Sequence, residues 1–344
     1  MKIRIYKYVL LFLIAMLSTS VSSCQKTKME EKFEWSGTLS APDEYPVEVY
    51  EGMLVSENFT QYFKDWGIVN PGWGTAGGTV VIGPDLKTIP SRLEITWLSL
   101  VENKFYSGQF DLPKEKIVQM FKQGFLNDQN EKETYDTIIA GLAPGGTVVI
   151  WLMAAGRQVE VAKFQAHNIQ IDPAGISEND KYMFEAGYNE TVLSSINVLK
   201  PATKEKIATV GYTGINKYGD TYRIKYNWKP SILLPAGGKL MHFTATLYNG
   251  EMEKLAGELL ATADYTPRAI PVRCNIYWIS AQNKDHGARV STFDEKEILN
   301  AFKGLGSEKV QLVLEVADDT SVKIYLKTES GSQVQINNAN IKTQ

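Results

Sequence analysis

Aromatic side chains gather between residues 59 and 78, and two of them are candidates for contact with a ligand. Trp66 and Trp73 lie in this segment, and the second is followed by several glycines, among them Gly77 and Gly78. Aromatic faces stack on sugar rings or anchor a protein partner. Glycines break regular structure, so an indole beside them can lie on an accessible loop. Trp73 is therefore the stronger ligand-binding candidate and Trp66 the weaker one.

The same segment has a second interpretation, in which the aromatic residues belong to a core. Phe59, Tyr62, Phe63 and Trp66 have the i, i+3, i+4, i+7 spacing that predicts one face of a helix. This spacing favours a structural role for Trp66. Trp73 lies outside the pattern and keeps its place as the ligand-binding candidate.

The remaining reactive residue types form no recognisable catalytic or metal-binding motif. His167, His242 and His286 are scattered, without a histidine or cysteine partner at ligand spacing, and no serine lies in a Gly-x-Ser-x-Gly elbow. Cys274 lies in an alternating apolar segment, which predicts a buried and inert thiol. We expect no catalytic residue, no metal and no cofactor. A dispersed pair of carboxylates stays open, because an acid and a base need no sequence proximity.

Two further segments look reactive and are better explained as a turn and a loop. Gly141 to Thr147 is rich in glycine, but it lacks the Gly-Lys-Ser/Thr ending of a phosphate-binding loop and an apolar strand follows it. Pro144-Gly145 instead predicts a hairpin turn. The polar run from Gln282 to Gly287, which contains His286, predicts a surface loop.

The N-terminus has the anatomy of a secretory signal peptide. A short basic region precedes the apolar stretch Tyr8 to Leu17 and a run of small residues that ends at Ser23. This apolar stretch is far short of the roughly 20 residues that a transmembrane helix needs. Residues 1–23 are therefore predicted to be a cleaved signal peptide.

Val21-Ser22-Ser23-Cys24 looks like a lipobox, in which an aliphatic residue and two small ones precede the cysteine that is lipidated. Three acyl chains on Cys24 would hold the protein durably on a membrane, because each buried methylene contributes about 0.8 kcal/mol. Gln25 stands where an aspartate would mark retention at the inner membrane, which favours the outer membrane. We predict a lipid-anchored protein of the bacterial cell envelope, and the periplasmic or surface face stays open.

The composition limits the partners and the kind of fold. Acidic residues outnumber basic ones, and loss of the three basic residues in the signal peptide makes the mature chain more acidic still. It has no basic stripe of the kind that binds nucleic acid. Cys274 is the one thiol left after lipidation, so no intramolecular disulfide can form. The mature chain, from Cys24 to Gln344, is long enough for two domains.

An internal repeat predicts how these domains arose. Ile89 to Ser99 aligns without gaps with Ile270 to Ser280. Further on, Ala143 to Leu152 aligns with Ala317 to Leu326 after a shorter loop. The sequence therefore predicts a tandem duplication.

The local patterns of the repeat predict an α+β unit. Arg92 to Leu100 alternates as a strand does, and Lys114 to Gln123 has apolar residues at helical spacing, with a second-copy helix that begins at the N-cap candidate Asp294. Three further strands are predicted at Asp136 to Gly141, Thr147 to Met153 and Gln158 to Gln165. We expect two tandem, divergent copies of a mainly antiparallel sheet with one packed helix. The expected segments are a signal peptide (1–23), a lipidated tether (24–44), a first unit (45–171), a connector (172–220) and a second unit (221–344).

One part of the chain resembles a known family. The residues that carry the resemblance are Trp97, Lys104-Phe105-Tyr106, Leu112-Pro113, Gly141-Leu142-Ala143-Pro144-Gly145-Gly146 and Trp151. They resemble the pattern of a bacterial lipoprotein family of unknown function, the domain of unknown function family 2931, over roughly residues 45–170. The second copy departs from the pattern at Asp318-Asp319-Thr320. The resemblance implies an envelope lipoprotein and supplies no activity.

These observations leave three hypotheses for the function. The first is a non-enzymatic binding or interaction protein, whose partner is a protein such as a toxin that it neutralises. The second is a glycan-binding module that uses Trp66 and Trp73. The third is a hydrolase with a dispersed acid/base pair. The sequence favours the first and leaves the oligomeric state open.

Overall fold

The computed structural model describes residues 30–64, 66–78, 83–127, 129–317 and 321–344. The architecture below is that of residues 33–344, which form one compact unit. The predicted signal peptide and Cys24 lie outside the described residues, so both stay predictions. In the described part of the chain, no helix combines the length and the apolar character that crossing a membrane requires.

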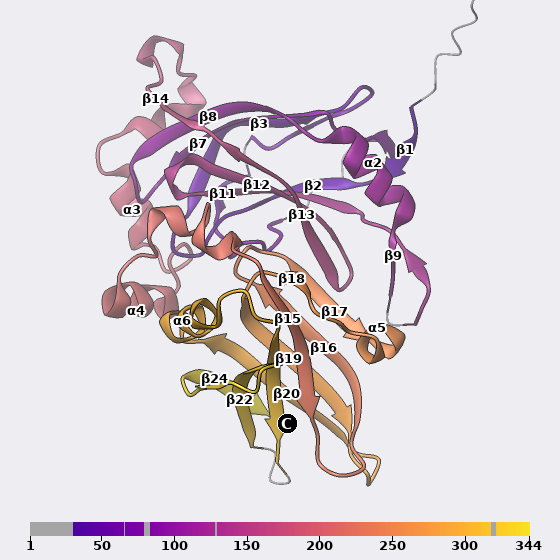
Figure 1. Ribbon diagram of the computed structural model, residues 1–344. Helices are drawn as coiled ribbons and strands as arrows, with labels where there is room; N and C mark the ends of the chain where they lie inside the picture. The colour runs from indigo at the N-terminus through magenta and orange to yellow at the C-terminus, as the bar shows by residue number, and fades with distance from the viewer. Residues whose placement is uncertain (1–29, 65, 79–82, 128, 318–320) are drawn as a thin grey trace, which may run out of the picture. The chain divides into compact units, whose positions relative to one another are not determined.

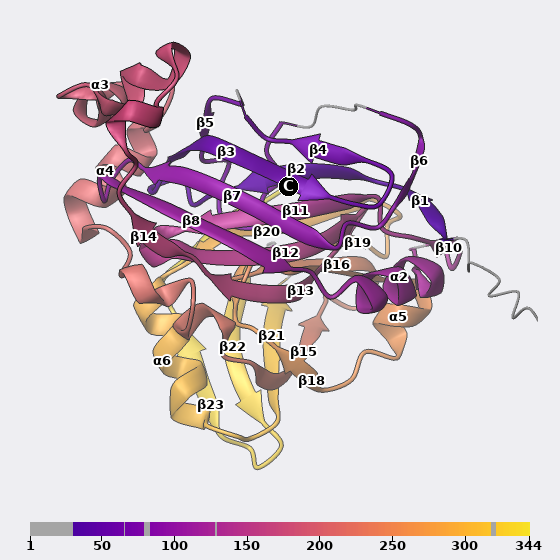
Figure 2. The same ribbon diagram turned by 90° about the horizontal axis from the view of Figure 1, so that it is seen from above.

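The first half of this unit, residues 33–171, consists mostly of strands. They are β1 (Lys32–Glu34), β2 (Ser36–Ser40), β3 (Val47–Val55), β4 (Thr60–Tyr62), β5 (Ile68–Val69), β6 (Leu86–Thr88), β7 (Arg92–Ser99), β8 (Lys104–Asp111), β9 (Phe125–Leu126), β10 (Lys132–Glu133), β11 (Thr137–Ala143), β12 (Thr147–Ala154), β13 (Arg157–Gln165) and β14 (His167–Ile169). A six-stranded sheet of β14-β8-β7-β3-β4, with β5 beside β3, packs on β2-β11-β12-β13 (Figure 1). Figure 2 shows β3, β7 and β8 lying over β11 and β12. The helix α2 (Lys114–Gln123) adds Ile117 and Phe121 to the core between the sheets.

The second half, residues 221–344, is built in the same way. Its elements are β15 (Tyr226–Leu233), β16 (Lys239–Leu247), β17 (Met252–Ala256), α5 (Gly257–Ala261), β18 (Thr266–Arg268), β19 (Pro271–Ile279), β20 (Asp285–Phe293), α6 (Glu295–Leu305), β21 (Val310–Val316), β22 (Val322–Thr328), β23 (Gln333–Ile336) and β24 (Ala339–Thr343). A five-stranded sheet of β18-β15-β21-β22-β23 packs on β16, β19, β20 and β24. These last strands join the first half in one nine-stranded sheet, β2-β11-β12-β13-β17-β16-β19-β20-β24.

The two halves share their order of elements and their strand pairing. β3-β7-β8-β14 and β16-β19-β20-β24 are both antiparallel. β2 runs parallel to β11 and β15 runs parallel to β21, and each is followed by an antiparallel continuation, β11-β12-β13 and β21-β22-β23. In each half the helix, α2 or α6, follows β8 or β20 and precedes the antiparallel strands β11-β12-β13 or β21-β22-β23. The chain is therefore α+β with mainly antiparallel sheets, as the sequence predicted.

A buried tryptophan occupies the same place at the start of each half. The Trp35 Nε1 donates to the Thr88 carbonyl oxygen at 3.1 Å, and the Lys87 ammonium lies 5.4 Å from the indole ring centre. In the second half, the Trp228 Nε1 donates to the Ala269 carbonyl oxygen at 3.0 Å, and the Arg268 guanidinium lies 5.5 Å from the ring centre. Lys87-Thr88 and Arg268-Ala269 directly precede the two repeated segments, so the ungapped alignment extends to them.

Most predicted elements are confirmed, with small changes at their ends. The helix Lys114–Gln123 has the predicted bounds, and the Asp294 carboxylate accepts from the Glu297 backbone N–H as an N-cap. Trp97 and Trp278, which the alignment pairs, are both buried, at 0 % and 2 % exposure.

The predicted tether of residues 24–44 ends earlier than expected, because β2 lies inside it and is part of the nine-stranded sheet. Its sequence, Ser-Gly-Thr-Leu-Ser, has one large apolar side chain, which suggested an exposed segment. The hydroxyls are buried with partners, since Ser40 Oγ donates to the Gly72 carbonyl and Thr38 Oγ1 to the Gly78 carbonyl, both at 2.9 Å. The first half therefore begins near residue 33 and not at residue 45.

Two local predictions are wrong. The helical spacing of Phe59, Tyr62, Phe63 and Trp66 does not mark a helix, because β4 spans Thr60–Tyr62 and pairs with β3. His286 does not lie on a loop, because β20 begins at Asp285 and the imidazole stacks on Trp278 with ring centres 5.3 Å apart. In both cases cross-strand pairing overrides a short local pattern.

The connector, residues 172–220, contains short helices. They are the 3₁₀ segments Pro173–Gly175, Glu178–Phe184 and Ile215–Lys217, with α3 (Tyr188–Ser194) and α4 (Pro201–Val210) between them. The second 3₁₀ segment begins directly after Ser177. Pro201 takes the first position of α4, where a missing backbone N–H costs nothing.

Candidate functional site

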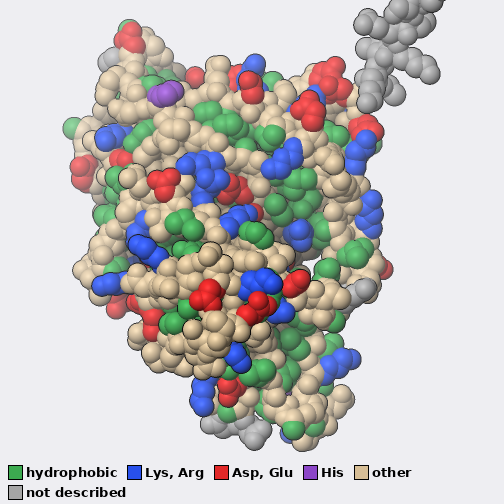
Figure 3. Space-filling view, viewed as in Figure 1, with side chains coloured by type: hydrophobic (Ala, Val, Ile, Leu, Met, Phe, Trp, Pro, Cys, Tyr) green, Lys and Arg blue, Asp and Glu red, His purple; other side chains and the backbone are tan. Residues whose placement is uncertain are grey.

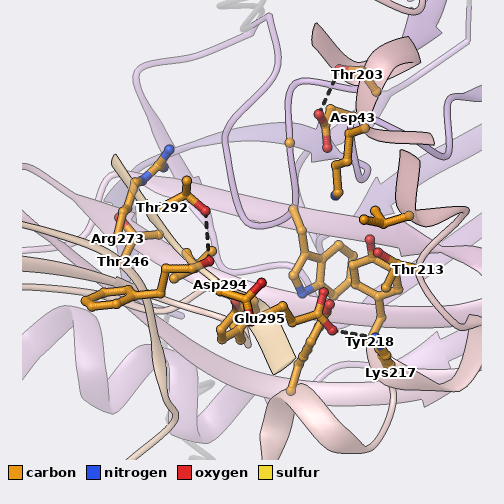
Figure 4. Close-up of a pocket in the computed structure, with 18 of the residues that line it drawn as sticks. Asp43, Thr203, Thr213, Lys217, Tyr218, Thr246, Arg273, Thr292, Asp294 and Glu295 are labelled. Atoms are coloured by element: carbon orange, nitrogen blue, oxygen red, sulfur yellow. Dashed lines mark hydrogen bonds and ion pairs between the residues drawn. The ribbon is translucent and has the colours of Figure 1, made fainter. Parts of the chain in front are cut away.

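A groove of about 1150 Å³ lies where the connector meets both halves. Its walls come from the loop at residues 70–75, from the connector at residues 200–218, and from the second half at residues 246–248, 272–273, 292–300 and 338–340. Figure 4 shows Arg273, Thr246 and Thr292 at one end, Asp294 and Glu295 in the middle, and Asp43 with Thr203 toward the other end.

The connector wall is fixed by a buried carboxylate. Glu44 is fully buried and accepts from the Lys206 ammonium, from the Thr213 backbone N–H at 3.2 Å and from the Tyr218 hydroxyl at 3.2 Å. The neighbouring Tyr45 hydroxyl donates to the Thr213 carbonyl at 2.5 Å. Burial, helped by the charge of Glu44, raises the pKa of Tyr45 to about 12. These bonds hold residues 206–218 against the first half.

Trp73 forms part of the groove wall, and its ring packs between two aromatic side chains. Its ring centre lies 4.8 Å from that of Trp151 and 5.2 Å from that of Tyr218, both edge to face. The Trp73 Nε1 is buried and has no hydrogen-bond partner among the described residues. Trp66 does not line the groove, and its ring meets Phe63 edge to face at 5.1 Å. The structure thus brings one of the two predicted ligand-binding residues to the groove.

The loop that carries Trp73 is tied to the sheets by its backbone. The Gly72 N–H donates to the Ala41 carbonyl at 3.0 Å, and the Gln158 side chain donates to the Gly74 carbonyl at 2.6 Å. Gly74 has a φ of 74°, and a Cβ there would lie 2.5 Å from the Gly250 Cα. Glycine is therefore required at this position by both conformation and space.

The carboxylates of the groove are already engaged within the protein. Asp43 accepts from the Thr203 hydroxyl at 3.0 Å, Asp294 caps α6, and Glu295 pairs with the Lys217 ammonium. Burial, followed by the charge of Glu295, raises the pKa of Tyr222. A phenol and carboxylates held in this way position the walls and give no visible acid/base pair.

Three cations that line the groove, Arg273, Lys200 and Lys296, have no ion pair among the described residues. The Arg273 Nε donates to the Thr246 hydroxyl at 3.1 Å, and the described residues provide no ion pair for the guanidinium. Burial and the nearby charge of Arg289 lower the pKa of Arg273. Lys200 and Lys296 also line the groove, and neither ammonium has an ion pair within the described ranges.

The other sequence candidates have structural roles. Cys274 is fully buried, and burial raises the pKa of its thiol to about 12. In the Pro144–Gly146 turn, the Gly145 N–H donates to the Glu102 carboxylate at 3.1 Å, so a protein carboxylate occupies the place of an anion. Among the described residues, no group of three His, Cys, Asp or Glu side chains could hold a metal ion.

Sequence reasoning missed Arg273 and the connector side of the groove. The alignment pairs Arg273 with Arg92, but whether Arg273 could bind an anion depends on which of its neighbours in space carry charge. The connector has no aligned counterpart, and its contacts with Glu44 and Tyr45 join segments that are far apart in the sequence. Only the folded chain brings these segments together.

Comparison with known proteins gives one family. The family model DUF2931, described as a protein of unknown function, matches residues 22–213. The resemblance drawn from residues 45–170 is thereby confirmed, and it extends over β2 and most of the connector. The second half lies outside the matched residues. No curated protein and no solved structure matches the chain.

Proposed function

Since the chain belongs to the DUF2931 family of proteins of unknown function, we propose a function from its groove: a lipid-anchored envelope protein that binds a segment of a protein partner and catalyses no reaction. The observation that carries this proposal is the groove itself, about 1150 Å³ in volume and walled by three separate segments. Clefts between structural elements are where ligands most often bind.

An apolar rim supports a protein partner. Val210 and Tyr212 line the groove from the connector, and their side chains are 70 % and 42 % exposed. Ile215, 44 % exposed, lies a few residues farther along the connector. Neighbouring exposed apolar side chains of this size mark interaction sites, and a tyrosine among them can serve as an anchor.

A glycan is the second candidate for the ligand. The packing of Trp73 and Trp66 favours it less than a protein partner. A sugar ring stacks on an open aromatic face. Trp73 is flanked by Trp151 and Tyr218, and Trp66 lies edge to face against Phe63. A hydrolase is favoured less again, because the groove carboxylates Asp43, Asp294 and Glu295 all have protein partners.

The evidence for the proposed lipid anchor comes from the sequence. The lipobox Val21-Ser22-Ser23-Cys24 supports lipidation at Cys24, and Gln25 supports delivery to the outer membrane. A lipidated protein with a groove near its connector would present that groove to partners in the envelope.

We also propose that the two halves are divergent copies of one ancestral unit. The common strand order supports this, and so do the matched contacts of Trp35 and Trp228 with Lys87-Thr88 and Arg268-Ala269. Phe33 and Tyr226 add a further pair, because each packs on an equivalent helix phenylalanine, Phe121 or Phe302, with ring centres 5.4 Å apart.

Site-specific cross-linking in living cells tests the proposed function. A photoreactive phenylalanine replaces Tyr212 at the groove rim, or Tyr62 as a control that is 61 % exposed on β4. We expect a discrete protein adduct at position 212, none at position 62, and loss of the adduct when Thr292→Trp fills the groove. Equal adducts at both positions, or none at position 212, would refute groove binding.

A further inference from the structure

Arg273 is a half-buried cation for which the described residues offer no anion. Its side chain lines the groove from β19 and makes one hydrogen bond, from Nε to the Thr246 hydroxyl at 3.1 Å. Removing a charge from water is costly unless the charge is paired, so buried cations normally have an anionic partner. The terminal nitrogens of this guanidinium have no hydrogen-bond partner among the described residues.

Neighbouring strands add positive charge to the same face of the sheet. Arg289 on β20 lies opposite Asn275 on β19, and Lys342 on β24 lies opposite Arg289. Arg273 and Asn275 are two residues apart on β19, so they share this face. Arg273 and Arg289 interact unfavourably as like charges. An anion bound between them would relieve this repulsion.

The first half has a carboxylate beside the arginine that aligns with Arg273, and the second half has none there. Arg92, the residue aligned with Arg273, forms an ion pair with Glu94 at 2.6 Å. In the same ungapped alignment, Glu94 is matched by Asn275, a neutral residue whose Oδ1 is buried without a hydrogen-bond partner among the described residues.

The cross-strand neighbour also differs between the halves. Gln109 lies opposite Glu94 in the first half, whereas Arg289 lies opposite Asn275 in the second. At one position of the same fold, the second half therefore lacks a carboxylate and has an additional guanidinium.

We propose that the Arg273 end of the groove binds the carboxylates of an acidic, partly apolar segment of a partner protein. This inference rests on the proposed function and names the chemistry of its partner. A carboxylate matches the planar donors of a guanidinium, to which it can bind in bidentate fashion. Lys200 and Lys296 add charge along the groove, and the groove carboxylates are turned to partners within the chain.

Two features favour an extended peptide over an acidic glycan. The exposed side chains of Val210 and Tyr212 at the connector rim offer apolar contacts for leucine-like side chains. β24, whose Asn340 lines the groove, is the last strand of the nine-stranded sheet, so one of its edges is unpaired among the described residues. An extended segment can add backbone hydrogen bonds at such an edge.

The test measures binding of labelled peptides to the lipidated full-length chain in detergent. The probes are a decapeptide of alternating leucine and glutamate, its glutamine analogue, and an oligogalacturonate as the acidic glycan. We expect the glutamate peptide to bind roughly tenfold more tightly than the glutamine peptide, since hydrogen bonds to charged groups contribute about that much. The difference should shrink at about 0.5 M salt through screening.

Three variants test whether the preference for the glutamate peptide depends on Arg273. Arg273→Gln should remove the preference for glutamate, and Asn275→Glu should remove it as well by restoring the internal carboxylate that Glu94 supplies in the first half. Arg92→Gln, the matched change in the first half, should leave the preference intact. Unfolding midpoints in urea verify that each variant is folded, and Asn275→Glu keeps the test valid if Arg273→Gln does not fold.

The results distinguish failure of the acidic-peptide proposal from failure of groove binding itself. Equal binding of the glutamate and glutamine peptides overturns the acidic partner, and groove binding stands if the cross-link at position 212 is present. Tighter binding of oligogalacturonate than of the peptide overturns the peptide assignment. An unchanged glutamate preference in Arg273→Gln and Asn275→Glu overturns the assigned site.

Discussion

Trp73 illustrates how far single residues can be interpreted from sequence. The glycines around it marked a loop, and the structure gives a loop that lines the groove. The sequence could not show that Trp151 from β12 and Tyr218 from the connector would pack against the indole. Those contacts come from segments that are distant in the sequence. Trp73 therefore both lines the groove and packs against Trp151 and Tyr218.

Truncation of Trp73 should therefore affect stability as well as binding. We expect Trp73→Ala to lower the free energy of unfolding by about 2 kcal/mol, less than for a fully buried tryptophan, through loss of its aromatic contacts. Urea denaturation measures this. Val210→Ala, at the exposed rim, should change stability by less than about 0.5 kcal/mol while weakening peptide binding. An unchanged unfolding curve for Trp73→Ala would show that the packing around the indole contributes nothing.

Tyr45 makes stability depend on pH in the alkaline range. Folding raises the pKa of Tyr45 from 10.0 to about 12, so the folded protein keeps a proton that the unfolded chain releases above pH 10. This contribution is complete below pH 10 and is lost as the pH rises through 12.

Urea denaturation between about pH 9 and pH 12 tests this dependence on Tyr45. Tyr45→Phe should show a shallower fall in stability with pH than the unmodified chain. The exposed variant Tyr62→Phe serves as the control and should keep the full slope. Identical slopes in all three proteins would remove Tyr45 from the explanation.

At the scale of elements, the sequence predicted well wherever a pattern was long and periodic. The helix Lys114–Gln123 and the strands β7, β11, β12 and β13 appear within a few residues of their expected bounds. The failures are short segments. β2 was missed because its small hydroxyl residues are buried through hydrogen bonds, and β4 because four aromatic residues matched a helical spacing by chance.

Two buried tryptophans, Trp35 and Trp228, should contribute strongly to the stability of the two halves. Trp35 directly precedes β2 and Trp228 lies in β15, and the two side chains are 2 % and 0 % exposed. Each change to alanine should lower the free energy of unfolding by about 3 to 5 kcal/mol, because a large cavity is left in a core. Urea denaturation provides the measurement. A negligible loss for Trp35→Ala would return residues 30–44 to the tether that the sequence predicted.

Across the whole chain, the sequence alignment indicated similar segments in the two halves but did not indicate the groove. It gave no sign that β17 would join the halves into one sheet or that the connector would form a wall. On the face shown in Figure 3, acidic and basic side chains are interspersed, in keeping with the nearly balanced composition. The local excess of cations around Arg273 arises from pairing between strands and not from composition.

Membrane attachment is predicted to depend on one atom, the sulfur of the Cys24 thiol. Cys24→Ala should abolish labelling by a fatty-acid probe and move the protein from the detergent phase to the aqueous phase, because no other group can accept the diacylglyceryl chain. Cys274→Ala is the matched control and should remain lipidated, since its thiol is buried in the second half. A labelled Cys24→Ala protein would contradict the lipobox.

The central claim is that a partner segment lies in the groove, and hydrogen exchange on the lipidated chain tests it most directly. Exchange is compared with and without the saturating leucine–glutamate decapeptide. A segment bound in the groove should slow exchange in the three segments that form the walls, residues 70–75, 206–218 and 292–300, and leave exchange in β4 and β5 unchanged. Protection confined to the six-stranded sheet, or no protection in any wall segment, would contradict it.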